Sequence, residues 1–209
     1  MIVVLLLGLT IAGCGSSEST YQKTNIVGKK TLFRPSKEKP PEWTQKERRW
    51  VVKGKANDAD TVYFKGVAEN QVDLFAGTAM AKADAIKNLG ESIRTDLEVV
   101  FGTRLEGNAT DKIAQYMNLM INTATRDISA RLSTIDDYWE EYEVGTYDGV
   151  TYKYDIWSLN AIPEKEFNKY CENAFSKAKQ ESEARQDEEI KQKLEQGQRE
   201  FLKRLEQHK

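Results

Sequence analysis

Few side chains in this 209-residue chain have the chemistry of a catalytic or covalently modified residue. The two thiols are Cys14 and Cys171, and the only imidazole is that of His208. A single histidine next to the C-terminus cannot supply a histidine-based triad or a metal site with several histidine ligands. Cys171 lies at helical spacing from apolar residues, which indicates a small buried thiol. Cys14 is therefore the residue best placed for covalent chemistry.

Cys14 comes directly after a short apolar segment. The segment is far shorter than the roughly 20 residues of a membrane-spanning helix, so it is typical of a removable signal. The tetrad Ile11-Ala12-Gly13-Cys14 resembles the lipobox of bacterial lipoproteins. This resemblance implies that residues 1–13 are a lipoprotein signal peptide and that Cys14 becomes an acylated, membrane-bound N-terminus.

The acyl chains would be covalent lipid, and we predict no other cofactor and no metal. Each buried methylene contributes about 0.8 kcal/mol, so two or more chains hold a protein on a bilayer almost permanently. Gly15 follows the cysteine, whereas an Asp there marks inner-membrane retention in enterobacterial lipoproteins. The resemblance therefore favours the outer membrane, with the body facing the periplasm or the cell surface.

Four carboxylates lie close together, those of Asp136, Asp137, Glu140 and Glu141. Paired carboxylates perform glycan hydrolysis, where one donates a proton and the other acts as nucleophile or base. Successive residues of a strand point to opposite faces, so sequence neighbours do not converge on one bond. Asp137 and Glu141 would share a face. We expect a solvated acidic hairpin without catalytic residues, and the sequence contains no phosphate-binding loop, Cys-x-x-Cys pair or metalloprotease motif.

Aromatic residues crowd the same region: Tyr138, Trp139, Tyr142, Tyr147, Tyr152, Tyr154 and Trp157. Some must fill the core of a small sheet, and the others could form a face that binds sugar or protein. Trp139 and Tyr147 are the best candidates for exposure. The predicted interaction face is therefore Trp139, Tyr147, Asp137 and Glu141.

Charge is unevenly distributed. Between residues 21 and 55 there are 11 Lys or Arg residues against 3 Glu residues, a local excess of +8. A basic arm after a lipid anchor would favour anionic headgroups, by about 1 kcal/mol per charge near the surface. Solubility and extension of a tether explain the same excess, and the sequence leaves both readings open. Nucleic acid is not an expected partner for a lipid-anchored exported protein.

The elements that must position these residues begin after a polar segment. Residues 14–47 are rich in Ser, Lys and Pro, which predicts a flexible basic tether. Residues 48–168 are expected to form an α+β domain. Its first strands are predicted at 50–53 and 61–68, paired as a hairpin.

Apolar residues then recur at three- and four-residue steps, which predicts two helices. The first has the stripe Val72, Phe75, Ala79, Ala83, Ile86, Ile93, Leu97 and Val100, and its many alanines allow close approach to a sheet. The second has Ile113, Met117, Met120, Ile121, Ala124, Ile128 and Leu132. Two further strands follow, at 134–144 and from Val150 onward, joined by a glycine-containing turn.

A last helix is predicted from Pro163, and its apolar face should dock on the domain. The stripe thins after Lys179 to Ile190, Leu194, Phe201 and Leu205 among many charges. We assign residues 169–209 to a long charged C-terminal helix. A solvated helix is favoured there, and a weak coiled coil or a partner-binding tail are the alternatives.

The order of several landmarks resembles a known family. They are Pro41-Glu42-Trp43, the strand Tyr63–Ala68 before an Ala-rich helix, Leu132–Trp139, and Gly149–Leu159 leading to Ile162-Pro163. Over roughly residues 41 to 168 the chain resembles the LPP-twenty-type bacterial lipoproteins, which include surface antigens and lipoproteins of flagellar motility. The resemblance implies a dodecin-like α+β fold, with long helices on one face of a small antiparallel sheet of about four strands.

Two functional hypotheses follow. The first is a lipid-anchored envelope protein that acts as a scaffold or interaction module, self-associates, and is surface- or flagellum-associated. Its partners would be membrane lipid through Cys14 and other envelope proteins or peptidoglycan. The second is a peptidoglycan-associated enzyme or enzyme activator that uses the acidic, aromatic hairpin. The family resemblance implies no catalytic residue, so we expect the protein not to be an enzyme.

Overall fold

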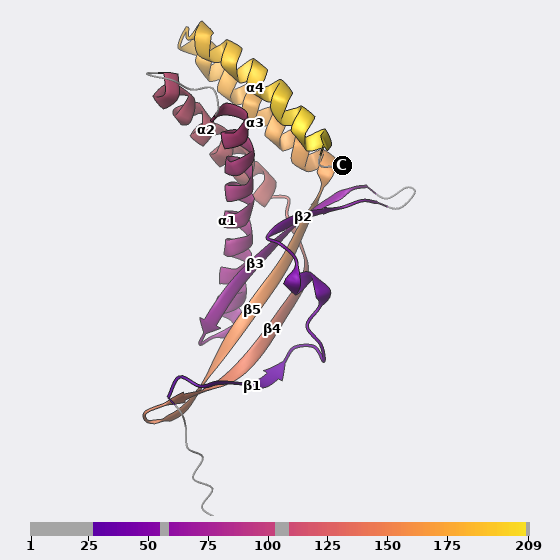
Figure 1. Ribbon diagram of the computed structural model, residues 1–209, viewed down its shortest axis with the longest axis vertical. Helices are drawn as coiled ribbons and strands as arrows, with labels where there is room; N and C mark the ends of the chain where they lie inside the picture. Colours follow the sequence, from indigo (N-terminus) through magenta and orange to yellow (C-terminus); the bar gives the residue numbers. More distant parts are fainter. Residues whose placement is uncertain (1–26, 55–58, 103–108, 208–209) are drawn as a thin grey trace, which may run out of the picture.

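The computed structural model describes residues 27–54, 59–102 and 109–207. They form one five-stranded antiparallel sheet and four α-helices, which confirms the α+β class with one strand more than expected (Figure 1). The elements are β1 (Lys30–Pro35), the short helix η1 (Glu42–Gln45), β2 (Arg49–Val52), β3 (Thr61–Gln71), α1 (Leu74–Phe101), α2 (Ala109–Ser129), β4 (Ser133–Thr146), β5 (Gly149–Pro163), α3 (Glu164–Ala184) and α4 (Glu188–Gln207).

The strand order in the sheet is β1-β4-β5-β3-β2. The predicted hairpins are present: β2 pairs with β3, and β4 pairs with β5 along nearly their whole length. Gly149 follows the β4–β5 turn with a φ of 134°, a conformation open to glycine and strained for residues with a side chain. The long β4–β5 hairpin is the central feature of the sheet.

Helix α1 packs along one face of the sheet, over β3 and β5. The helix-facing residues of β3 alternate and are small or apolar: Val62, Phe64, Gly66 and Ala68. A Cβ at Gly66 would overlap the backbone carbonyl oxygen of Ala81 in α1. The missing side chain therefore allows helix and strand backbones to approach each other closely, as the Ala-rich sequence predicted.

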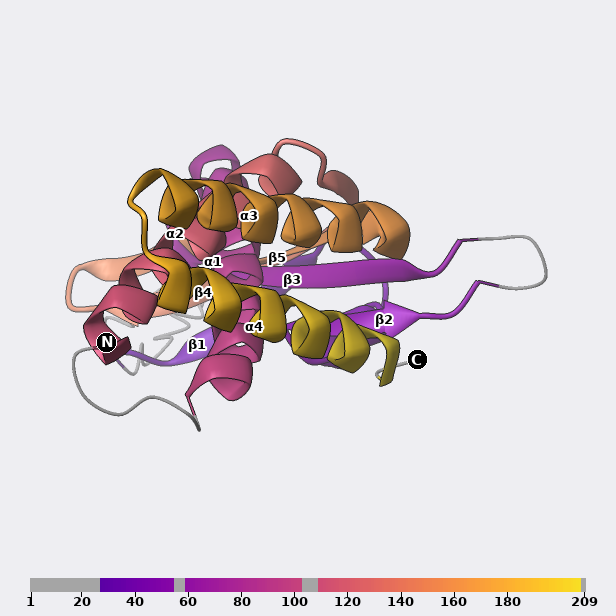
Figure 2. The same ribbon diagram turned by 90° about the horizontal axis from the view of Figure 1, so that it is seen from above.

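The upper part of α1 leaves the sheet and joins α2, α3 and α4 in a helical lobe (Figure 1). Figure 2 shows α3 and α4 side by side across the end of the sheet. Cys171 is buried in this lobe, and burial raises the pKa of its thiol to about 12. No helix in the part of the chain that the structure describes is both long and apolar enough to cross a membrane.

The prediction of a solvated C-terminal helix over 169–209 is wrong. Two antiparallel-packed helices, α3 and α4, occupy this range, and Ile190, Leu194 and Phe201 are buried. Gly197 explains the fit, since a Cβ there would overlap the ring of Phe101 in α1. The thin apolar stripe is sufficient because Ile190, Leu194 and Phe201 all pack in the core of the lobe.

The prediction of a flexible tether over 14–47 is wrong for its described part. Residues 30–35 form β1, which pairs with β4, and Thr44 of η1 is buried. The physical reason is charge: Lys30, Arg34 and Lys37 form ion pairs with acids of the β4–β5 hairpin. The basic excess of this region thus has a third explanation, neutralisation of the acidic hairpin within the chain.

The predicted apolar stripe of α1 is divided by the fold. Its upper members, Ile93, Leu97 and Val100, are buried in the helical lobe. Of its lower members, Phe75 is 85% exposed on α1, and Val72, which is 77% exposed, lies before the helix begins at Leu74. The sheet instead covers a second, smaller-residue face that includes Ala81 and Ala85.

Candidate functional site

The β4–β5 register determines where the predicted interaction residues lie. Asp137 pairs with Ser158 and Glu141 pairs with Tyr154. Alternate residues of a strand share a face, so Asp137, Trp139 and Glu141 all point to the side of the sheet that carries α1. Tyr147 is in the turn at the far tip of the hairpin and is 92% exposed. The structure therefore brings three of the four residues onto one face and leaves Tyr147 apart.

Glu141 is buried and belongs to a charge cluster. It accepts hydrogen bonds from Arg34 Nε and, at 2.8 Å, from the hydroxyl of Tyr154. The Arg34 guanidinium lies 5.7 Å from the centroid of the Trp139 ring, within cation–π range. The bond to the carboxylate, with burial second, raises the pKa of Tyr154. Glu141 is thus a structural acid that ties β1 to the hairpin, and the expectation of a solvated carboxylate there is wrong.

Trp139 and Asp137 are both half-buried. The Trp139 ring meets Tyr154 edge to face at 5.9 Å and, like Leu74 at the start of α1, packs against the small core cluster that includes Ile156. Asp137 Oδ2 lies 3.8 Å from Lys82 Nζ of α1. Its other oxygen is buried without a hydrogen-bond partner. Both residues therefore serve mainly to fix α1 on the hairpin.

Beyond the first turn of α1, no element among the described residues covers the same side of the hairpin. Phe33 and Tyr152 meet edge to face at 5.2 Å and are 56% and 42% exposed. Val150 is also exposed, and Trp139 and Tyr154 continue the surface toward α1. We call these five residues the hairpin face. Sequence reasoning missed Phe33 because it falls in the predicted tether, although the β-forming run Thr31-Leu32-Phe33 was a usable signal.

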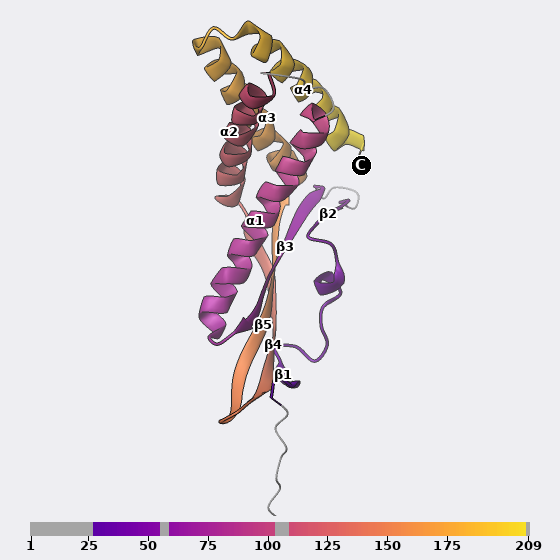
Figure 3. The ribbon, with the colours of Figure 1, turned by 60° about the vertical axis from the view of Figure 1, so that its left-hand side comes forward.

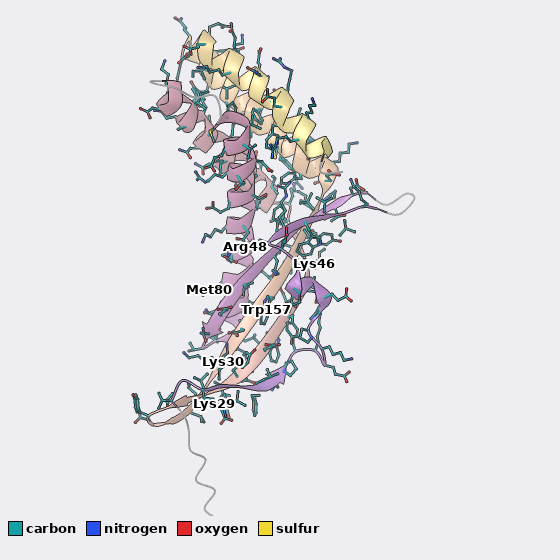
Figure 4. The ribbon with its side chains drawn as sticks, in the orientation of Figure 1. Lys29, Lys30, Lys46, Arg48, Met80 and Trp157 are labelled. Atoms are coloured by element: carbon teal, nitrogen blue, oxygen red, sulfur yellow. The ribbon has the colours of Figure 1, made fainter. Side chains whose placement is uncertain are left out.

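A second acidic cluster lies on the opposite side of the sheet. Glu140 and Asp155 are paired directly in the register, a placement that is unfavourable for like charges. Glu140 accepts hydrogen bonds from the hydroxyls of Tyr138 and Tyr142. Asp155 accepts from Lys30 Nζ and, at 2.9 Å, from the backbone N–H of Asn70. Lys30, labelled in Figure 4, also lies 4.0 Å from the centroid of the Tyr142 ring.

Glu140 and Asp155 share only one feature with the active site of a glycoside hydrolase, namely two acids that lie close together. Each of the four carboxylate oxygens of Glu140 and Asp155 already accepts a hydrogen bond from the protein. Burial, and then the bond to Glu140, raises the pKa of Tyr138 and Tyr142 well above the usual tyrosine value. Such hydroxyls are poor proton donors at neutral pH. The arrangement neutralises two opposed acids and presents no acid–base pair to a substrate.

Two hollows lie elsewhere on the surface. One of about 590 Å³ is lined by Asp60, Glu164 and Glu172 together with Lys165 and Lys169 at the β5–α3 junction. Both oxygens of Asp60 bind Gly54 N–H and Lys53, which lower the pKa of that carboxyl. The other, of about 460 Å³, is the groove between α1 and α2. Across the described ranges, no three potential ligand residues are grouped as a metal site.

Comparisons of the chain with protein-family models, with curated proteins and with solved structures find no significant match. The resemblance to LPP-twenty-type lipoproteins therefore stays a prediction. So do the lipobox residues Ile11, Ala12 and Gly13 and the lipidation of Cys14, all of which lie outside the described residues.

The start of the described chain lies beside the hairpin. Gly28 N–H donates to the carbonyl of Gly145 at 3.0 Å, and Gly145 N–H donates to the carbonyl of Lys29 at 3.2 Å. This places the N-terminal end of the body at the hairpin tip, opposite the helical lobe (Figure 1). An attachment through residues N-terminal to this point would therefore orient the hairpin toward the attachment surface.

Proposed function

We propose that the chain is a lipid-anchored protein of the outer membrane, of the LPP-twenty type that its sequence resembles. It acts as a structural or interaction module of the cell envelope, with the hairpin face as its docking surface. The observation that carries the proposal is the exposed apolar surface of Phe33, Val150 and Tyr152, which no described element covers. An exposed apolar patch on an otherwise charged surface is typical of an interaction site.

The position of the hairpin supports the same proposal. The 14 residues from Cys14 to Val27 are joined by 13 peptide bonds and can span at most about 45 Å when fully extended. A lipid on Cys14 would thus hold the hairpin face near the membrane and direct the helical lobe away from it. A partner at the membrane surface, or a second layer of the envelope close to it, is then within reach.

The alternative, a peptidoglycan-associated enzyme or activator, has weaker support. The hairpin acids Glu140, Glu141 and Asp155 accept hydrogen bonds from Tyr, Arg and Lys side chains of the protein. A glycan could still stack on the aromatic hairpin face without reaction. Incubation of the protein with purified peptidoglycan distinguishes the two, since release of soluble fragments would overturn the non-enzymatic proposal.

Lipidation is tested with the full chain in a diderm bacterial host. We expect radiolabelled palmitate to enter the wild-type protein and to be absent from Cys14→Ser, which should leave the membrane fraction. Cys171→Ser is the matched control, because that thiol is buried and its loss should leave labelling unchanged. Equal labelling of wild type and Cys14→Ser would contradict the anchor.

The docking surface is tested by a photo-crosslinking amino acid at Tyr152, in the anchored protein in cells. We expect one discrete crosslinked species, and we expect Phe33→Ala in the same chain to reduce it several-fold. The control is the same photo-crosslinker at Ser176, which is exposed on α3 in the helical lobe. Equal patterns from positions 152 and 176 would contradict a specific hairpin partner.

A further inference from the structure

The outer side of α1 has an apolar seam that no described element covers. Within α1 its members are spaced alternately by three and four residues and lie opposite the sheet: Ala76, Ala79, Ala83 and Ile86, followed by the half-buried Gly90. Phe75 and Met80 flank the seam and are exposed. In Figure 3 no other ribbon lies over this part of α1, and Figure 4 labels Met80 on it. This spacing is the heptad pattern of a helix that packs against another helix.

The same seam is covered higher on the helix. Continuing the alternation from Gly90 leads to Ile93, Leu97 and Val100, all buried in the helical lobe. One continuous heptad stripe is therefore packed against helices above and open below. A helix that is apolar on both the sheet side and the outer side needs a partner on each.

A protruding side chain and a groove lie beside the seam, and they could fit together as a knob and a hole. The knob is Phe75, 85% exposed near the lower end. The hole is the groove of about 460 Å³ between α1 and α2, where Gly90 leaves space beside Thr125. The buried Oγ1 of Thr125 has no hydrogen-bond partner there. Phe75 and Gly90 are about 22 Å apart along the helix at 1.5 Å per residue.

We propose that this seam binds the same seam of a second copy of the chain, in antiparallel orientation about a two-fold axis near position 81. Ala76 then faces Ile86 of the second copy, and Ala79 faces Ala83. Each larger side chain meets a small one, and each Phe75 reaches the groove of the other copy. A two-fold interface requires such self-complementarity of one surface patch.

Charge favours the same orientation. Asp73, the N-cap residue of α1, and Lys87 are exposed near opposite ends of the seam. In the antiparallel pair each Asp73 lies near Lys87 of the second copy, which gives two pairs of opposite sign. A parallel pair would place like charges together, oppose the two Phe75 rings and leave both grooves empty.

The interface is one helix seam and a shallow groove, smaller than a standard stable interface. We therefore expect a dissociation constant on the order of 10–100 μM in solution. Dimerisation through this seam requires no lipid on Cys14. Its test is therefore independent of the test of the proposed lipid-anchored function.

The test uses the full chain with Cys14→Ser, so that the buried Cys171 is its only remaining native thiol. Met80 lies next to the proposed two-fold axis, so Met80→Cys should form a disulfide-linked dimer under mild oxidation. Ser176→Cys is the matched control on exposed α3 and should stay monomeric. A monomeric Met80→Cys protein at concentrations above about 100 μM would overturn the proposal.

Sedimentation equilibrium gives the second measurement. Ala83→Arg places a charge in the centre of the seam and should raise the dissociation constant at least about tenfold. Because Ala83 is exposed, its thermal unfolding should match that of the parent chain. Unchanged association in Ala83→Arg would overturn the proposal. So would a monomer that binds vesicles of anionic phospholipid through Phe75, since the seam would then cover a lipid surface.

Discussion

Gly66 shows how one residue permits the packing of two elements. Its position faces α1, where Ala81 and Ala85 bring the helix backbone against the strand. We expect Gly66→Ala to lower the free energy of unfolding by about 3 kcal/mol, because the new Cβ meets backbone that cannot move aside. Urea unfolding measures this change.

Gly90→Ala is the control for this substitution. Its Cβ would meet only the flexible Thr125 side chain, at 3.3 Å. Alanine is also preferred over glycine within a helix by about 1 kcal/mol. Stability close to wild type is therefore expected for Gly90→Ala, and an equal loss in both variants would contradict the close-approach explanation.

The carboxylate of Asp136 binds the N-terminal segment to the hairpin, and these bonds depend on its ionisation. It accepts hydrogen bonds from Lys37 Nζ at 2.6 Å and from the Trp43 indole at 3.0 Å. Partial burial opposes ionisation, but these bonds outweigh it and lower the pKa of Asp136 below its usual 3.8. A lowered pKa stabilises the fold above about pH 4, and this contribution is lost as the pH falls through the folded-state value.

We therefore expect the melting temperature of wild type to fall more steeply than that of Asp136→Asn between about pH 5 and pH 2. The measurement is thermal unfolding at a series of pH values. Asp148→Asn, in the exposed hairpin turn, is the control and should keep the wild-type slope. Parallel curves of melting temperature against pH for wild type and Asp136→Asn would show that these bonds do not contribute to the pH dependence of stability.

At the scale of elements, α4 tests whether the C-terminal region belongs to the fold. Leu194 is fully buried between the helices of the lobe, whereas Arg199 on the same helix is exposed. Leu194→Ala should reduce the free energy of unfolding by about 2–5 kcal/mol, and Arg199→Ala by less than about 0.5 kcal/mol. Chemical denaturation measures both changes in the free energy of unfolding. Equally small changes in the two variants would mean that α4 is a solvated helix that does not contribute to the core.

At the scale of the whole molecule, α1 connects the sheet to the helical lobe. All four tryptophans, Trp43, Trp50, Trp139 and Trp157, lie in the sheet or its covering segment, whereas three of the four α-helices lie in the lobe. Tryptophan fluorescence therefore reports the sheet, and far-ultraviolet circular dichroism reports mainly helices. Because one continuous helix serves both cores, we expect the two signals to unfold in one transition.

Leu194→Ala makes this prediction sharper. A substitution confined to the lobe should shift the fluorescence transition of the sheet by the same amount as the circular dichroism transition. Two separated midpoints would mean that the lobe and the sheet are independent folding units joined by α1.

The sequence alone determined the elements whose signals are local. The period of two in β4 and β5, the period near 3.6 in α1, α2 and α3, and the turn before Gly149 are all visible in short windows and are present in the structure. The α+β class follows from their order. These features depend on backbone geometry and side-chain alternation, which neighbouring residues suffice to define.

Only the tertiary structure decided which surfaces are covered. Lys30 and Arg34 were predicted to lie in a solvated tether, but the β4–β5 hairpin, more than 100 residues away, supplies an acid for each of them, Asp155 and Glu141, and β4 supplies a strand to pair with. The α1 stripe looked uniform, yet α2–α4 cover its upper half and leave Phe75 exposed. Burial and ion pairing depend on which distant residues meet, and that is determined by how the elements pack together and by no local pattern.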